Sequence, residues 1–293
     1  MQTQSVQWDF TGHRVLVTGG SRGIAAELSY KLAMRGAEVA VNFSAAADSR
    51  FGRAEAASSL IERIEADGGR AISVEQDLLL PEGGSSLAEK AQAIAGPIDT
   101  LVLSASIQYH VPFLLQTAKD VADQIRINLQ ANIELLQTLM PPMALSGYGR
   151  ILAIGSIQEV SPSPEMPVYA MTKAAMKNLV ENLAVQSASR GILINNIAPG
   201  LIQTDRNAFR RSDPADWDRM QSKANPVGRA GQPDDLTALA LHLLSPENTF
   251  TTGATIYSTG GGHIPVGTGG YAELVLPQST EETAKRLEVS PQV

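Results

Sequence analysis

The stretch Thr18-Gly-Gly-Ser-Arg-Gly-Ile24 separates a short apolar run from a segment with helical spacing. The run, Arg14–Thr18, is rich in β-branched residues, which favours a buried strand. A helix is predicted after the glycines, and a second strand at 38–43. Glycines between a strand and a helix let the backbone approach a phosphate, whose charge a helix N-terminus favours. The stretch therefore predicts the first turn of a dinucleotide-binding sheet, with an ordinary glycine turn as the alternative.

Strands and helices keep alternating along the chain. Further strands are predicted at 71–77, 100–106, 150–156, 192–197 and 255–258, and helices at 54–66, 85–95, 118–140, 169–189 and 233–244. We expect the helix predicted at 118–140 to stop at Pro141-Pro142, because proline lacks a backbone N–H. Alternation implies a parallel sheet covered on both faces and joined by right-handed crossovers. The predicted fold is α/β, a seven-stranded doubly wound parallel sheet (Rossmann fold).

The alternating region spans 11–263 without an internal linker or repeat, which predicts a single dinucleotide-binding catalytic domain. A short N-terminal tail, 1–10, precedes it, and a C-terminal extension, 264–293, follows it. Within the extension, Ser279-Thr-Glu-Glu282 predicts the capping box of a short helix. The extension is expected either to dock on a neighbour or to be loose.

Composition argues against several classes of protein. Acidic residues outnumber basic ones, 30 to 23, whereas nucleic-acid binders normally carry a basic excess. The absence of cysteine removes disulfides and thiolate chemistry, and His110 has no partner at ligand spacing, so no metal site is expected. No run approaches the ~20 apolar residues of a membrane span, and the N-terminus does not resemble a signal peptide. We therefore predict a cytoplasmic protein with no nucleic-acid or membrane partner.

Tyr169 and Lys173 stand four residues apart at the start of a predicted helix and so share one face. Tyrosine has a pKa of about 10, too high for efficient acid–base work near neutral pH, but a neighbouring ammonium favours the phenolate. This spacing alone is common on helices. Ser156 ends the preceding strand, at the edge where parallel sheets bind ligands, and Asn128 lies in a long helix where asparagine is a mediocre choice. A strand-end turn and a satisfied polar residue are the alternatives for these two.

The type of dinucleotide depends on charge at the end of the second strand. That strand ends Asn42-Phe-Ser44, with no carboxylate before Asp48. A carboxylate there would bind the ribose 2′-hydroxyl and repel a 2′-phosphate. Arg22, unless it is a solvated surface residue, could pair with a phosphate. The sequence therefore favours NADP(H), with NAD(H) as the second possibility; the apparent insertion 45–52 could add a phosphate contact.

The motifs together resemble the short-chain dehydrogenase/reductase family, in its compact single-domain branch that includes the 3-oxoacyl-ACP reductases. The matching pieces, in family order, are Thr18-Gly-Gly-Ser-Arg-Gly-Ile24, Asp77, Asn128-Leu129, Gly155-Ser156, Tyr169-x-x-x-Lys173, Ala198-Pro-Gly-Leu-Ile-Gln-Thr204, Gly228-Arg-Ala-Gly-Gln-Pro-Asp-Asp235 and Thr259-Gly-Gly-Gly262. The resemblance covers 11–263. It implies an NAD(P)-dependent oxidoreductase of class EC 1.1.1.- that interconverts a ketone or aldehyde and an alcohol by hydride transfer.

The resemblance also implies a role for each matched residue. Tyr169 would act as acid or base, Ser156 would hydrogen-bond the substrate oxygen, and Lys173 would hold the nicotinamide ribose and favour the phenolate. Asn128 would hold a water that relays protons. Cofactor contacts are implied for Gly19, Ser21, Arg22, Gly23, Ile24, Asn42, Ser44, Asp77, Leu78, Ser104, Ala105, Ser106, Tyr169, Lys173, Pro199, Gly200, Ile202 and Thr204. A homotetramer, or a homodimer, is the implied assembly.

The sequence departs from the family pattern after the fourth strand. Leu103-Ser-Ala-Ser106 stands where the family usually has Asn-Asn-Ala-Gly, so Ser106 adds a side chain near the cofactor. Segments 107–113, 158–166 and 205–226 should line the substrate pocket, and 205–225 is a candidate lid. These segments hold His110, Gln158, Glu159, Met166, Arg206, Phe209, Arg210, Arg211 and Trp217. The arginines could meet an anionic substrate or form a solvated loop face.

Three other functions use parts of the same pattern. A non-catalytic dinucleotide-binding sensor would have no need of Ser156, Tyr169 and Lys173. A nucleotide-assisted epimerase or dehydratase is disfavoured by the compact length and by the lack of a separate C-terminal substrate domain. Enoyl reduction is disfavoured because such reductases of this family separate the tyrosine and the lysine more widely.

Overall fold

One parallel sheet forms the centre of the protein, and its inner strands β1, β4, β5 and β6 are buried almost throughout. The computed structural model describes residues 8–265. The strands are β1 (Arg14–Val17), β2 (Glu38–Phe43), β3 (Arg70–Glu75), β4 (Thr100–Leu103), β5 (Gly149–Ile154), β6 (Ile192–Pro199) and β7 (Thr255–Ser258). Their order is β3-β2-β1-β4-β5-β6-β7, and every neighbouring pair is parallel. The predicted seven-stranded doubly wound sheet is confirmed for the described residues.

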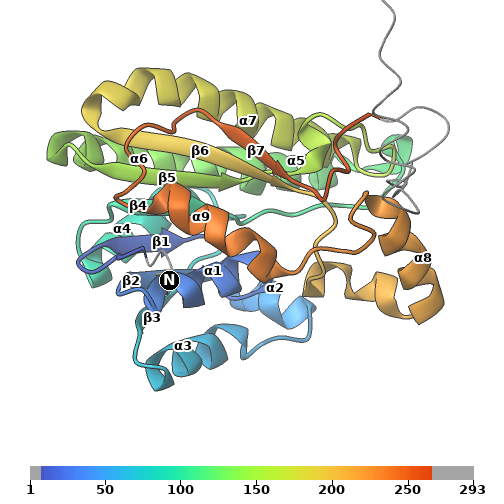
Figure 1. Ribbon diagram of the computed structural model, residues 1–293, viewed down its shortest axis with the longest axis horizontal. Coiled ribbons are helices and arrows are strands. Elements are labelled where there is room, and N and C mark those ends of the chain that lie inside the picture. The colour runs from blue at the N-terminus through green and yellow to red at the C-terminus, as the bar shows by residue number, and fades with distance from the viewer. Residues whose placement is uncertain (1–7, 266–293) are drawn as a thin grey trace, which may run out of the picture. The chain divides into compact units, whose positions relative to one another are not determined.

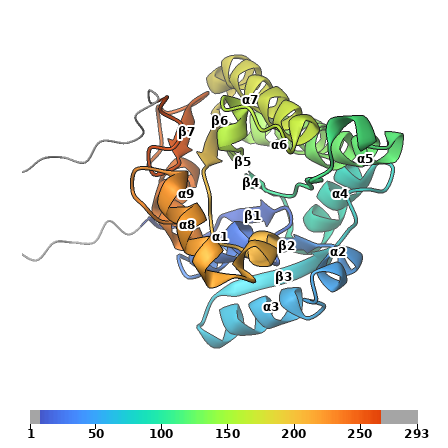
Figure 2. The same cartoon turned by 90° about the vertical axis from the view of Figure 1, so that its right-hand side faces the viewer.

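Helices cover both faces of the sheet. They are α1 (Gly23–Ala33), α2 (Ala45–Arg50), α3 (Ala56–Ala66), α4 (Gly83–Ala95), α5 (Ala118–Ile125), α6 (Ala131–Ser146), α7 (Pro167–Ser187), α8 (Pro214–Ala224) and α9 (Thr237–Leu244). Apolar side chains of α4, α6 and α7 pack in one core on one face, and those of α1, α3 and α9 pack in a second core on the other. In Figure 2, α4 and α6 lie to the right of β4 and β5, and α9 lies to their left.

The predicted end of the long helix at Pro141-Pro142 is wrong. The structure has α5, then a π-helical turn at Arg126–Gln130, and then α6, which continues through both prolines to Ser146 and ends at Gly147 in a left-handed conformation. Leu139 and Met143 are buried on either side of the prolines. Burial of this apolar face compensates for the backbone hydrogen bonds that proline cannot donate.

Two segments without a predicted structure contain helices. The insertion 45–52 contains α2, which begins where the Ser44 hydroxyl accepts a hydrogen bond from the Ala47 N–H. The polar segment 205–225 contains a 3₁₀ helix, η5 (Asp205–Arg211), and α8, which Asp213 caps. Short polar N-caps of this kind satisfy the free N–H groups of a first turn. The helix predicted at Ser279 lies outside the described residues. Among residues 8–265, no helix is both long and apolar enough to cross a membrane.

The neighbouring strands β1 and β4 continue into turns that touch each other (Figure 1). The Thr18 hydroxyl accepts hydrogen bonds from Ser104 N at 2.9 Å and Ala105 N at 3.0 Å. Gly19 has a φ of +60°, and a Cβ added to it would lie 3.1 Å from the Cα of Ala105. Glycine is therefore required here both by conformation and by space. This is the point where the strand order reverses, and doubly wound sheets bind ligands at such a point.

Candidate active site

Tyr169 and Lys173 lie on the first turns of α7, and Pro167 begins that helix. Both side chains are only 6 % exposed, and the Lys173 Nζ lies 5.7 Å from the centre of the Tyr169 ring. The Lys173 ammonium donates a 2.6 Å hydrogen bond to the carbonyl of Ile154, the last residue of β5. Burial lowers the pKa of Lys173, and the nearby positive charge of Arg206 lowers it further. The predicted pair therefore shares one buried place beside the end of β5.

Ser156 follows β5 by two residues and begins a 3₁₀ turn, η3 (Ile157–Glu159). Its hydroxyl accepts a 3.2 Å hydrogen bond from Gln158 N, and its own N–H donates to Glu159 Oε1 at 3.0 Å. The Asn196 amide holds both oxygens of the Glu159 carboxylate, at 3.1 and 2.9 Å. A Cβ on Gly155 would overlap that carboxylate. Glu159 thus fixes the backbone that presents Ser156, and burial raises the pKa of Glu159.

Asn128 lies in the π-helical turn and is 1 % exposed. Its amide oxygen accepts from Ile107 N at 2.9 Å, and its amide nitrogen donates to Ile107 O at 2.9 Å and to Thr172 Oγ1 at 3.0 Å. These bonds join the segment after β4 to the residue beside Lys173. The proton-relay role implied for Asn128 stays a prediction.

The side chain of Asn42, which is 2 % exposed, supports the glycine turn. The Asn42 amide oxygen accepts a hydrogen bond from Gly19 N at 3.0 Å, while its nitrogen donates to Val74 O and Gln76 O at 3.3 and 3.1 Å. The side chain therefore positions the turn and joins β2 to β3. The cofactor contact implied for Asn42 stays a prediction.

A buried carboxylate lies against this turn, and the sequence reasoning missed it. Asp48, on α2, is 1 % exposed. Its Oδ1 accepts from Arg22 Nε at 2.7 Å and from Ser21 Oγ at 3.2 Å, while its Oδ2 is buried without a hydrogen-bond partner in the described structure. Arg22 also stacks on Phe51, with its guanidinium carbon 4.2 Å from the ring centre. Ser21 and Arg22 therefore form a cradle that already holds an oxyanion.

A family profile described as Enoyl-(Acyl carrier protein) reductase matches residues 19–263. L-rhamnose 1-dehydrogenase (NAD(P)(+)) of Sphingomonas sp. (strain SKA58) is 31% identical over 254 residues, which are 86% of this chain and 97% of that protein. The chain belongs to the short-chain dehydrogenase/reductase family. It is an NAD(P)-dependent oxidoreductase of the dehydrogenase and reductase type.

Two solved structures of this family are similar to the whole sheet and its helices. A 3-oxoacyl (acyl-carrier-protein) reductase from Agrobacterium tumefaciens C58, solved with NADP bound, is 38% identical with a TM-score of 0.82, covering 89% of this chain and 99% of that one. A gluconate 5-dehydrogenase from Burkholderia cenocepacia J2315, in complex with NADP and tartrate, is 30% identical with a TM-score of 0.79, covering 89% and 98%. These similarities support the predicted family and the predicted NADP(H) or NAD(H) cofactor.

The remaining residues implied by the family resemblance lie along the same edge of this dehydrogenase/reductase. Of the residues for which the resemblance implies contact with the adenine, Asp77 accepts a 2.9 Å hydrogen bond from Leu79 N, and Leu78 is buried in the core. Of the residues for which the resemblance implies contact with the nicotinamide, Pro199 ends β6 and Ile202 forms an isolated bridge with Gly231. The remaining members of that set are Gly200, which packs on Thr259, and Thr204, which caps η5 and whose side chain faces Gly23 of the glycine turn. These cofactor contacts stay predictions.

Three arginines of the predicted substrate segments form separate sets of contacts. Arg206 donates to Ser106 Oγ at 3.1 Å and to Ser106 O at 2.8 Å. Arg210 and His110 both lie 3.5 Å from the same oxygen of Glu165. Arg211 donates to Thr204 O at 3.0 Å and to Asn207 Oδ1 at 2.7 Å, so it supports its own loop. The three arginines thus have different partners, although they lie within six residues of one another in the sequence.

One of the missed contacts had a visible signal in the sequence. Ser156-x-x-Glu159 is a capping-box pattern, and this pattern predicts the hydrogen bond between Glu159 and the Ser156 N–H. The contact of Asp48 with Arg22 had no such signal, because it joins residues 26 positions apart and depends on where α2 packs.

Proposed function

We propose that this enzyme interconverts a carbonyl compound and its alcohol, with Tyr169 as the proton-transferring residue. The observation that carries the proposal is the burial of Tyr169, Lys173 and Ser156 together at the end of β5. A bound nicotinamide dinucleotide supplies the hydride. The chain contributes orientation, electrostatics and proton transfer, which are what a protein adds to such chemistry.

Each residue has a defined task in reduction. The Ser156 hydroxyl, fixed by its backbone contacts, donates a hydrogen bond to the substrate oxygen. The Tyr169 hydroxyl gives its proton to that oxygen as negative charge develops, and takes it back in alcohol oxidation. The Lys173 ammonium stabilises the phenolate that remains. Its bond to the Ile154 carbonyl holds it beside the ring, and Asn128 is proposed to connect it to solvent through a water.

We also propose that NADP(H) is preferred to NAD(H). The support is the cradle formed by Ser21 and Arg22, which already holds the Asp48 carboxylate and so suits an oxyanion such as a 2′-phosphate. Ser44 caps α2 directly beside it. Asp48 would have to release Arg22 for the phosphate, so the preference is predicted to be moderate.

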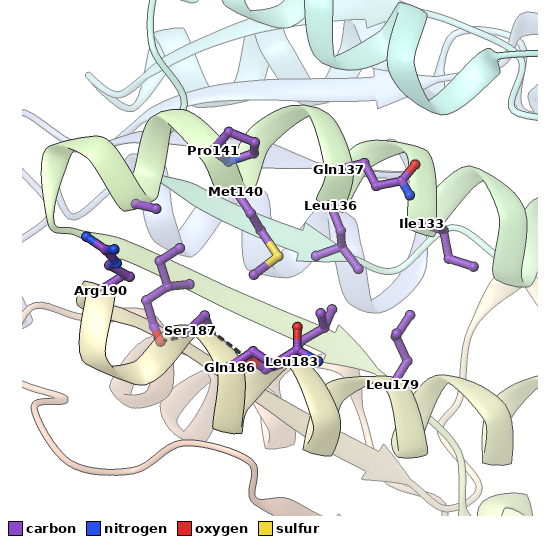
Figure 3. Close-up of a pocket in the computed structure, with 12 residues that line it drawn as sticks. Ile133, Leu136, Gln137, Met140, Pro141, Leu179, Leu183, Gln186, Ser187 and Arg190 are labelled. Atoms are coloured by element: carbon purple, nitrogen blue, oxygen red, sulfur yellow. Dashed lines mark hydrogen bonds between the residues drawn. The ribbon is translucent and has the colours of Figure 1, made fainter.

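The assembly is proposed to be a homotetramer or a homodimer of a cytoplasmic enzyme whose catalytic domain is 11–263. The support for assembly is an open groove of about 410 Å³ between α6 and α7 (Figure 3). Its lining is mainly apolar and includes Leu136, Met140, Leu179 and Leu183. Such a surface is suited to burial against a second copy. A monomer in light scattering would contradict the proposal.

The proposed function is tested by Tyr169→Phe, which removes only the hydroxyl. We expect turnover with a panel of ketones, oxoacyl thioesters and sugars to fall by at least about a hundredfold, the typical contribution of general acid–base catalysis. The dissociation constant of NADPH, measured by fluorescence titration, should change by less than about twofold, because phenylalanine keeps the ring in place. Undiminished turnover would remove Tyr169 from the mechanism. Phe250→Tyr, an exposed change of the reverse kind outside the predicted substrate segments, serves as the control.

A further inference from the structure

We propose that the substrate of this enzyme carries a carboxylate, and that Arg206 binds it beside Ser156 and Tyr169. The inference rests on the proposed function, because it concerns the substrate of the same site. It selects one of the three arginines of η5 and gives it a role in substrate recognition.

Arg206 is held by a segment that is hydrogen-bonded, through Asn128, to the helix of the catalytic residues. Its guanidinium donates two hydrogen bonds to Ser106, at 3.1 and 2.8 Å. The next residue, Ile107, is held through both its N–H and its carbonyl by Asn128, which also bonds Thr172 on α7. The guanidinium is therefore anchored at the segment that also contacts the helix of Tyr169 and Lys173.

The charge of Arg206 is not neutralised by the chain within residues 8–265. Seven other arginines of the described residues form an ion pair with a carboxylate, whereas Arg206, like Arg211, forms none; the seven are Arg14, Arg22, Arg53, Arg126, Arg210, Arg219 and Arg229. It is close enough to Lys173 for its charge to lower the pKa of that buried ammonium. The Glu159 carboxylate, which also acts on Lys173, is held by Ser156 and Asn196 instead. Two neighbouring cations without a dedicated carboxylate favour an anionic ligand.

The geometry of the guanidinium suits a carboxylate. An arginine side chain has five N–H donors, and the two contacts with Ser106 leave others for a ligand. A guanidinium binds a carboxylate through two parallel hydrogen bonds, which fixes orientation as well as charge. A substrate held at one end by Arg206 would have its oxygen-bearing carbon directed towards Ser156 and Tyr169.

The other two arginines do not fit this role. The charge of Arg210 is balanced by Glu165, which lies 3.5 Å from both Arg210 and His110. Arg211 is bonded to the carbonyl of Thr204 and to Asn207 within η5. The competing ligand is the phosphate of the dinucleotide, because it offers the same oxyanion chemistry to Arg206. The experiment must therefore separate a carboxylate substrate from the cofactor.

The test compares tartrate with threitol on the full-length enzyme saturated with NADPH, with which neither alcohol can be oxidised. The two probes share a four-carbon vicinal diol and differ only in having carboxylates or hydroxymethyl groups at the ends. Isothermal titration calorimetry should show that tartrate binds at least about tenfold more tightly, the effect of one charge-assisted hydrogen-bonded pair. Arg206→Gln should abolish this preference and Arg206→Lys should keep part of it. The control Arg210→Gln, which removes the same charge from the same loop, should change the preference by less than about twofold.

Three results would overturn the inference. One is equal binding of the two probes by the wild type, and another is an undiminished tartrate preference in Arg206→Gln. The third is a tenfold or greater rise in the NADPH dissociation constant of Arg206→Gln with the tartrate preference intact, which would assign the guanidinium to the cofactor. Failure of the wild type to bind NADPH at all would contradict the proposed function as well. Binding of NADPH without a preference for tartrate would contradict only the carboxylate substrate.

Discussion

The edge of the sheet carries buried or half-buried charges in two corners that are built in opposite ways. In the glycine-turn corner, Asp48 is paired directly with Arg22, so the two charges balance. In the catalytic corner, the Lys173 ammonium contacts a backbone carbonyl, and Arg206 contacts a serine. A buried charge without a partner is unfavourable, so it usually marks a functional site. An anion that binds Arg22 must therefore displace Asp48, whereas Lys173 and Arg206 form no ion pair with a carboxylate within residues 8–265.

The largest effect is expected from removing the buried cation of the catalytic corner with Lys173→Met. Turnover should fall by at least about a hundredfold, because the phenolate of Tyr169 loses its stabilising charge. Burial lowers the pKa of Lys173, so the unfolded chain binds this proton more tightly than the folded one. The wild type should therefore gain stability as the pH rises through the lowered pKa towards 10.5, and the variant should lack this gain.

This difference is measured by urea unfolding of both proteins at pH 7 and pH 9.5. Other groups titrate in both proteins, so the quantity of interest is the difference in unfolding free energy between wild type and variant. Each unit of pKa depression contributes about 1.4 kcal/mol to the change in that difference. A difference that does not change with pH would show that the lysine is not disfavoured as a cation.

A smaller effect is expected in the glycine-turn corner from Asp48→Asn. The neutral amide binds Arg22 more weakly, so a 2′-phosphate should displace it more easily. We expect the affinity for NADPH to rise about tenfold relative to that for NADH, in line with one charge-assisted hydrogen bond. Fluorescence titration of both dinucleotides measures the ratio. Asp67→Asn is the matched control, because it removes an exposed carboxylate whose hydrogen-bond partner among residues 8–265 is the Tyr30 hydroxyl.

An unchanged ratio in Asp48→Asn would mean that the carboxylate and the phosphate do not compete. Asp48 would then serve only to attach α2 to the glycine turn, and it would not control access of an anion to Arg22. An affinity for NADH that falls at the same time would assign Asp48 a direct contact with the ribose hydroxyl.

The two corners also differ in how far they could be predicted from the sequence. The glycine turn and the Tyr169–Lys173 pair each lie within a few consecutive residues, so their spacing alone indicates a shared face or turn. The contacts of Arg22 with Asp48 and of Arg206 with Ser106 join residues 26 and 100 positions apart. Local patterns do not encode such contacts, because they depend on where α2 and η5 pack on the sheet.

The same limit explains the helix through Pro141-Pro142. Local preference predicts a stop there, but the buried apolar face of α6 continues to Met143, and the gain from its packing outweighs the lost backbone bonds. The contact of Glu159 with Ser156 lies between these cases. Its capping-box spacing is visible in the sequence, whereas the Asn196 amide that holds the carboxylate comes from β6, 37 positions away.

The smallest effect is expected at this contact, from Glu159→Gln. Glutamine can still accept the hydrogen bond from the Ser156 N–H, but it removes a negative charge that acts on Lys173. We expect kcat to fall by about threefold to tenfold at neutral pH, with the NADPH dissociation constant unchanged. Glu159→Ala should lower kcat further, since it also frees the Ser156 backbone.

The pH dependence of kcat distinguishes the effect of the negative charge of Glu159 from the effect of its shape. Burial raises the pKa of Glu159 above 4.5, so on acidification the wild type loses this charge earlier than an exposed glutamate would. Below the raised pKa the wild-type side chain is neutral, as glutamine is, and the ratio of kcat between wild type and Glu159→Gln should approach one. At higher pH the wild type regains the charge and the ratio should widen. A ratio that stays constant between pH 5 and pH 8 would leave Glu159 with a purely steric role behind Ser156, and the catalytic corner would then hold its cations without any help from a carboxylate of the chain.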